Sequence, residues 1–155
     1  MTEPELLAHV RAVRALGWTV VMTNGVFDLL HAGHVEFLRA ARDLGHVLIV
    51  AVNDDDSTRR LKGLCRPYNT LADRMTVLEA LKCVDAVVPF SGDTPERLIG
   101  LVRPDVLVKG GDYAPDQIAG SEAVRAYGGT VRALDYHAGY STTRMHERIT
   151  GPAAS

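Results

Sequence analysis

Residues 19–34 read Thr-Val-Val-Met-Thr-Asn-Gly-Val-Phe-Asp-Leu-Leu-His-Ala-Gly-His, and they give the clearest indication of the fold. Residues 19–23 are β-branched or apolar and end at the turn signal Asn24-Gly25, so they are predicted to form a short buried strand. Residues 34–44 carry apolar side chains at helical spacing, and Gly45 follows as a stop signal. The stretch therefore predicts a buried strand that leads through a short loop into a helix.

The same alternation of strand and helix continues along the chain. Apolar runs predict further strands at 47–52, 86–90, 106–108 and 130–134. Helical patterns lie around and between them at 2–16, 70–81, 94–103, 121–127 and 142–149. Unbroken apolar strands separated by helices are typical of a parallel sheet that is buried on both faces. We therefore predict an α/β fold, with one Rossmann-like domain, a five-stranded parallel sheet and helices on both faces.

The length of 155 residues suits one domain with a single substantial core. We expect this domain to span residues 1–150, with residues 151–155 as a disordered tail. In open parallel sheets, ligands bind beyond the carboxyl ends of the strands. The loops expected to hold a ligand are therefore those that follow the strands, at 24–34, 53–62, 91–94, 109–113 and 135–143.

Composition excludes several classes of partner. With 17 basic and 19 acidic residues the formal net charge is −2, so no overall field favours nucleic acid. The longest apolar run, residues 47–52, is too short to cross a bilayer. The two cysteines form no disulfide framework and suit a reducing compartment. We expect a cytoplasmic protein that acts on small molecules, without a nucleic-acid or membrane partner.

Two histidines mark the first of these loops. His31 and His34 are three residues apart at the mouth of the predicted helix, so both side chains can face one point. Gly33 lies between them and removes a side chain where a phosphate would approach closely. The helix start adds free backbone N–H groups and the positive end of the helix dipole. Together these features predict an anion site that can stabilise charge on a phosphoryl group.

A metal site is the alternative interpretation of the same histidines. A structural zinc site normally has four protein ligands and a catalytic one has three. No third ligand is evident among the other histidines, so we expect no protein metal centre.

Residues 25–34 resemble the H-x-G-H signature of the cytidylyltransferase-like superfamily of nucleotidyltransferases. Residues 53–63, 66–67, 108–113 and 141–143 narrow the likeness, because they resemble the adenylyltransferase domain of the ADP-heptose pathway. That domain is often fused behind a sugar kinase domain, and the resemblance runs from about residue 19 to about residue 148. It implies transfer of AMP from ATP to D-glycero-β-D-manno-heptose 1-phosphate, giving ADP-heptose and pyrophosphate. It further implies Mg²⁺ bound mainly through the triphosphate, and a homodimer or higher homo-oligomer.

The resemblance also assigns roles to residues. His31, His34 and Lys62 are expected to be catalytic and to neutralise charge on the phosphates. Asp28, Lys62 and Arg74 are expected to bind the substrate, although Asp28 could instead hold the loop and Arg74 could be a solvated first-turn arginine. The residues expected along the nucleotide are Asn24, Gly25, Val26, Phe27, Gly33, His34, Lys109, Gly110, Asp112, Ser141, Thr142 and Thr143.

Other functions stay open at this point. One is a cytidylyltransferase that acts on glycerol 3-phosphate or a similar alcohol phosphate, and another is an enzyme that adenylylates flavin mononucleotide. Many cytidylyltransferases carry Arg-Thr-x-Gly-x-Ser-Thr before the last helix, whereas residues 136–143 lack that arginine, which agrees better with the heptose-type sequences. From a different class, the chain could be a nucleotide-binding module without turnover.

Overall fold

A computed structural model describes residues 1–111, 114–134, 145, 149 and 151 of the chain. Its centre is a five-stranded sheet in the order β3-β2-β1-β4-β5, and every neighbouring pair of strands is parallel. The strands are β1 (Val20–Gly25), β2 (Val47–Asn53), β3 (Ala86–Phe90), β4 (Val106–Gly110) and β5 (Thr130–Leu134). The predicted α/β fold with a five-stranded parallel sheet is confirmed.

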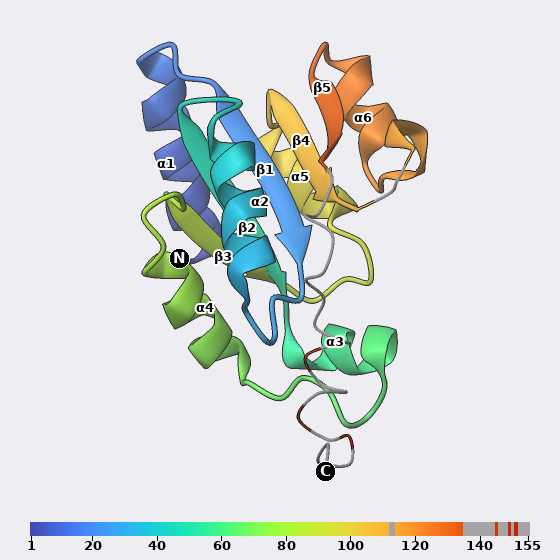
Figure 1. Cartoon of the computed structure of the whole chain (residues 1–155). Helices are drawn as coiled ribbons and strands as arrows, with labels where there is room; N and C mark the ends of the chain where they lie inside the picture. Colours follow the sequence, from blue (N-terminus) through green and yellow to red (C-terminus); the bar gives the residue numbers. More distant parts are fainter. Residues whose placement is uncertain (112–113, 135–144, 146–148, 150, 152–155) are drawn as a thin grey trace.

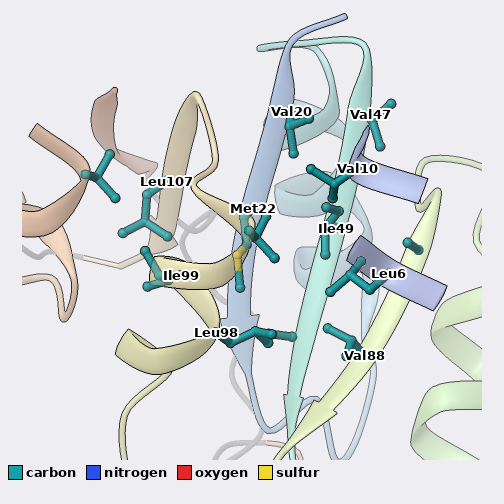
Figure 2. Close-up of a cluster of buried hydrophobic side chains, with 14 of the residues drawn as sticks. Leu6, Val10, Val20, Met22, Val47, Ile49, Val88, Leu98, Ile99 and Leu107 are labelled. Atoms are coloured by element: carbon teal, nitrogen blue, oxygen red, sulfur yellow. The ribbon is translucent and has the colours of Figure 1, made fainter. Parts of the chain in front are cut away.

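Helices cover both faces of the sheet (Figure 1). On one face, apolar side chains of α1 (Glu3–Ala15), α5 (Glu96–Val102) and α6 (Ser121–Ala126) join the core. Figure 2 shows part of this cluster, with Leu6 and Val10 of α1 and Leu98 and Ile99 of α5 against the sheet. On the other face the core is completed by α2 (Ala32–Arg42) and α4 (Leu71–Glu79). None of the helices in the described ranges has the length and apolar composition needed to span a membrane.

The central strand β1 positions the functional loop. It lies between β2 and β4, so the chain first builds β2 and β3 on one side of β1 and then crosses to add β4 and β5 on the other. The strand order reverses at this point, and ligands of doubly wound sheets bind at the carboxyl edge there. Residues 20–23 of β1 and all of β2 are buried, which explains why both strands read as unbroken apolar runs.

Residues 53–62, expected to be a loop, contain a helix. Helix α3 (Asp55–Lys62) lies beyond the carboxyl ends of the strands, as Figure 1 shows. Its first turn is acidic and its last turn is basic, which suits the helix dipole. The Asp54 carboxylate caps it by accepting a hydrogen bond from the Ser57 N–H at 2.7 Å. A short 3₁₀ turn, η1 (Pro115–Gln117), also lies in a segment that carried no prediction. The helix predicted at 142–149 and the tail at 151–155 fall almost entirely outside the described residues.

Candidate active site

A pocket of about 440 Å³ lies at the carboxyl edge of the sheet. Its walls come from the ends of β1, β2 and β4, the first turn of α2 and the last turn of α3. Eight residues predicted from the sequence line it: Asn24, Gly25, Val26, Phe27, Asp28, His34, Lys62 and Lys109. The lining also includes residues to which no individual role was assigned: Asn53, Leu61, Asp93 and Thr94 from loops that were expected to hold a ligand, together with Arg66, Pro95 and Ala119.

The turn after β1 is shaped by Gly25 and Phe27. Phe27 has φ +51°, a left-handed conformation that a bulky residue rarely adopts and that stores strain. A Cβ atom on Gly25 would lie 2.9 Å from Cε2 of the Phe27 ring. Gly25 therefore leaves room for this ring, which is buried and lies 5.7 Å from the ring of His34 between centroids. The glycine serves the shape of the loop that carries the site.

The two histidines lie together at the start of α2. His31 is the N-cap residue, and its backbone N–H donates a hydrogen bond to Nδ1 of His34 at 3.3 Å. The two ring centroids are 3.9 Å apart. Because Nδ1 of His34 accepts this bond, the neutral ring carries its proton on Nε2 and is a hydrogen-bond donor there. His34 lines the pocket, whereas His31 supports it from the side.

Burial decides the charge of both rings. Burial, with a smaller contribution from His31, lowers the pKa of His34 to about 4. Burial also lowers the pKa of His31. Both rings are therefore neutral at pH 7 in the unliganded protein. In this state they are neutral hydrogen-bond donors, and their role in offsetting charge on a bound phosphate stays a prediction.

Two lysines from different elements line the pocket, in addition to Arg66, which is paired with Asp28. Lys62 is exposed at the end of α3, and Lys109 is partly buried on β4. The Lys109 Nζ donates a hydrogen bond to the Asn24 carbonyl at 3.2 Å. Burial, and then repulsion by Lys62, lower the pKa of Lys109. A polyanion bound between the two ammonium groups would relieve that repulsion.

Asp28 holds a second loop in place. Its carboxylate, only 1% exposed, accepts hydrogen bonds from the N–H groups of Tyr68 and Asn69 at 2.9 Å and from Nε of Arg66 at 2.8 Å. Burial acts to raise the pKa of Asp28, but the Asn69 and Tyr68 N–H groups and the Arg66 guanidinium outweigh it and lower the pKa. Of the two roles expected for Asp28, substrate binding and holding a loop, these contacts correspond to the second. They also bring Arg66 to the pocket.

Arg74 lies beneath the pocket and is fully buried. Its NH1 group donates to the carbonyls of Val26 and Asn53, at 2.6 and 2.8 Å. Its Nε donates to the Asn69 carbonyl at 3.1 Å, and NH2 pairs with Asp55 at 2.8 Å. The alternative of a solvated arginine is wrong. Arg74 ties the loop after β1, the end of β2, the Asp28-bound loop and α3 together.

Several predicted residues do not line the pocket. Gly33 lies in the first turn of α2 and Gly110 at the end of β4. Asp112 and residues 141–143 lie outside the described part of the chain. Among the described residues, no three His, Cys, Asp or Glu side chains gather into a group that could hold a metal ion.

The fold and site together define a class: an α/β domain with a helix N-terminus, two histidines and two lysines at the switch point of a parallel sheet. The chain belongs to the cytidylyltransferase-like family, whose pattern matches residues 22–148.

Curated relatives are similar over almost the whole chain. "Bifunctional protein HldE" of Alkalilimnicola ehrlichii is 62% identical over 149 residues, which are 96% of this chain and 31% of that protein. The protein of the same name from Coxiella burnetii is 57% identical with the same coverage. This chain thus spans about a third of the length of these relatives. Among solved structures, the lipopolysaccharide core biosynthesis protein of Thermoplasma volcanium is 30% identical, with a TM-score of 0.62, covering 78% of this chain and 98% of that one.

Proposed function

We propose that the chain is an adenylyltransferase that transfers AMP from ATP to D-glycero-β-D-manno-heptose 1-phosphate, releasing pyrophosphate. The observation that carries this proposal is the convergence of His34, Lys62 and Lys109 on one pocket at the start of α2. Membership of the cytidylyltransferase-like family supports nucleotidyl transfer, and the similarity to the HldE proteins supports the heptose acceptor. We further propose that it acts in the cytoplasm as a homodimer or higher oligomer.

The proposed reaction is a direct displacement at phosphorus. An oxygen of the sugar phosphate attacks the α-phosphorus of ATP, a new P–O bond forms, and the bond to the β-phosphate bridging oxygen breaks as pyrophosphate leaves. A phosphate monoester is mostly dianionic at pH 7, because its second pKa is near 6, so it needs no enzymic base. Catalysis then depends on positioning and on stabilising charge.

The residues of the pocket divide that work. The Nε2–H group of His34 and the N–H groups at the start of α2 would donate to phosphate oxygens on which charge develops. Lys62 and Lys109 would offset the charge of the triphosphate. The backbone N–H of His31 would fix the position and tautomer of His34, and the His31 ring, stacked beside that of His34, would donate a second hydrogen bond to the phosphates.

Mg²⁺ fits this site as a companion of the triphosphate. Magnesium commonly uses one or two carboxylates together with phosphate oxygens and water. Of the two carboxylates that line the described pocket, Asp28 is bound to Arg66 and backbone N–H groups, and Asp93 is paired with Arg60. We propose that the phosphates hold the ion and the protein holds the phosphates, and that the ion offsets charge on the leaving group.

The test is pyrophosphate release from a matrix of ATP, CTP and GTP against heptose 1-phosphate, glycerol 3-phosphate and flavin mononucleotide, with Mg²⁺. The proposal expects release with ATP and heptose 1-phosphate alone. Release with CTP and glycerol 3-phosphate would replace it by a cytidylyltransferase that uses the same site. A protein that binds ATP but is silent across the matrix would be a nucleotide-binding module.

A further inference from the structure

We propose that Asn53 is a specificity-determining residue that accepts a hydrogen bond from a hydroxyl group of the sugar acceptor; this inference rests on the proposed function. Asn53 is the last residue of β2, is only 3% exposed, and lines the pocket. It begins a segment that was expected to hold a ligand, but no individual role was assigned to it.

The hydrogen bonds behind Asn53 determine which way its amide faces. The Ser57 hydroxyl donates to the Asp54 carbonyl at 3.2 Å, and a carbonyl can only accept. The same hydroxyl lies 3.2 Å from Nδ2 of Asn53, so it must accept there. The NH₂ group of Asn53 is therefore turned to Ser57, which is fully buried and does not line the pocket.

The amide oxygen of Asn53 is left for the pocket. Among the described residues, no donor reaches this oxygen, although the amide nitrogen and the backbone carbonyl of Asn53 are both engaged. The backbone is held by Arg74, whose guanidinium donates to that carbonyl at 2.8 Å. A nearly buried amide oxygen with a fixed direction and no protein donor is a rigid acceptor for a hydroxyl or amine of a ligand.

The strand order places this oxygen on the acceptor side of the pocket. Of the pocket-lining residues predicted along the nucleotide, Asn24 and Gly25 lie on β1 and Lys109 lies on β4. β2 lies on the opposite side of β1 from β4, and Gly25 pairs with Val52, the neighbour of Asn53. Adjacent strands are about 4.8 Å apart, so Asn53 lies one strand away from the loop after β1, on the side opposite to β4. An acceptor whose phosphate reaches the α-phosphorus would extend its hydroxyls toward this residue.

The experiment measures kcat/KM for heptose 1-phosphate and for its singly deoxygenated analogues, in the wild-type protein and in Asn53→Ala. Losing this hydrogen bond is expected to lower kcat/KM for the parent sugar about tenfold, with the KM for ATP unchanged. For one deoxy analogue, the kcat/KM of the wild type should fall by a similar factor, whereas that of Asn53→Ala should not fall further. The hydroxyl missing from this analogue is then the one that Asn53 binds.

A second pair of variants tests the amide orientation without altering the pocket lining. Ser57→Ala removes the group that orients the amide, and it should raise the KM for heptose 1-phosphate several-fold while the KM for ATP holds. Thr58→Val is the matched control, because Thr58 is the next buried residue of α3 and its hydroxyl has no partner within the described chain. This variant should leave both KM values unchanged.

The outcomes separate this inference from the proposed function. A wild-type protein that is silent with heptose 1-phosphate contradicts the proposed function. If the wild type is active but Asn53→Ala has the same kcat/KM for every analogue, the role of Asn53 is wrong while the proposed function stands. The same holds if Asn53→Ala raises the KM for ATP as much as the KM for heptose 1-phosphate. Equal behaviour of Ser57→Ala and Thr58→Val would overturn the orienting role of Ser57.

Discussion

At His34, burial makes proton binding unfavourable in the folded protein, and this links stability to pH. The pKa of the His34 ring is about 4 in the folded protein and about 6.5 in the unfolded chain. Between these pH values the unfolded chain takes up a proton at this ring, whereas the folded protein does not. Stability should therefore fall as the pH drops from 6.5 toward 4. At pH 5 the loss should be about 2 kcal/mol relative to pH 7.

Urea denaturation of the wild type and His34→Asn at pH 7 and pH 5 checks this expectation. Asparagine keeps an acceptor for the His31 N–H but does not titrate, so the variant should lack this part of the pH dependence. If both proteins lose the same stability between the two pH values, His34 is not a buried neutral ring.

Lys62 is expected to bind the triphosphate by its charge. Lys62→Ala should raise the KM for ATP about tenfold and lower kcat as well, since a charge-assisted hydrogen bond to a phosphate is lost. Lys82→Ala is the control, because this exposed lysine lies in a different surface pocket, beside α2 and α4. Steady-state kinetics with both variants checks the prediction, and an unchanged KM and kcat in Lys62→Ala would make Lys62 an ordinary surface lysine.

For single residues, the sequence indicated which side chains come together at the pocket, but not the contacts that hold them in place. The H-x-G-H spacing predicted both histidines at the start of a helix that follows a buried strand, and that placement is confirmed. The burial of Arg74 was undecided, because its acceptors are mostly backbone carbonyls from three separate segments. Because every residue has a backbone carbonyl, no sequence pattern shows which carbonyls will accept hydrogen bonds from a buried arginine. The neutral state of the histidines likewise depends on burial that only the packed structure shows.

Among the elements, α3 shows where sequence reasoning failed. Its residues include only one large apolar side chain, Leu61, so no hydrophobic periodicity marks a helix. Local signals stabilise it instead, through the Asp54 cap, an acidic first turn and a basic last turn. Helix α1 was easier to predict, because Thr2 and Glu5 have the spacing of a capping box, and the structure contains that capping box. Strands β3 and β5 were predicted with the bounds that the structure has.

The loop at residues 66–69 should depend on one carboxylate. Asp28→Asn keeps the shape of the side chain but replaces one accepting oxygen by an NH₂ group that faces the N–H donors of Tyr68 and Asn69. The variant should lose about 2–3 kcal/mol of stability, because these bonds go to a buried charge. Urea denaturation measures that loss, and chymotrypsin cleavage after Tyr68 should become faster as the loop opens.

Asp93→Asn is the matched control for stability. Asp93 pairs with Arg60 at the surface, where both side chains are at least half exposed, so this change should leave unfolding almost unaffected. If Asp28→Asn is as stable as Asp93→Asn and is cleaved no faster than the wild type, Asp28 does not hold the loop.

For the whole molecule, the alternation of apolar strands and helices was enough to predict a parallel sheet covered on both faces. The order β3-β2-β1-β4-β5 did not follow from the pattern, because every strand reads as equally buried. That order sets the end of β2 beside the loop after β1 and brings Asn53 into the lining of the pocket. Individual pocket residues were therefore predicted for the ends of β1 and β4, but not for the end of β2.

The most direct test of the account is transfer of label from [α-³²P]ATP to heptose 1-phosphate, with wild-type protein, His31→Ala and His34→Ala compared at pH 7. We predict labelled ADP-heptose from the wild type, and a kcat about 10²–10³-fold lower in each variant, as for the loss of one transition-state hydrogen bond. Circular dichroism would confirm that both variants are folded. Label that stays in ATP with the wild type, or a drop below about fivefold in both folded variants, would contradict adenylyl transfer by this site.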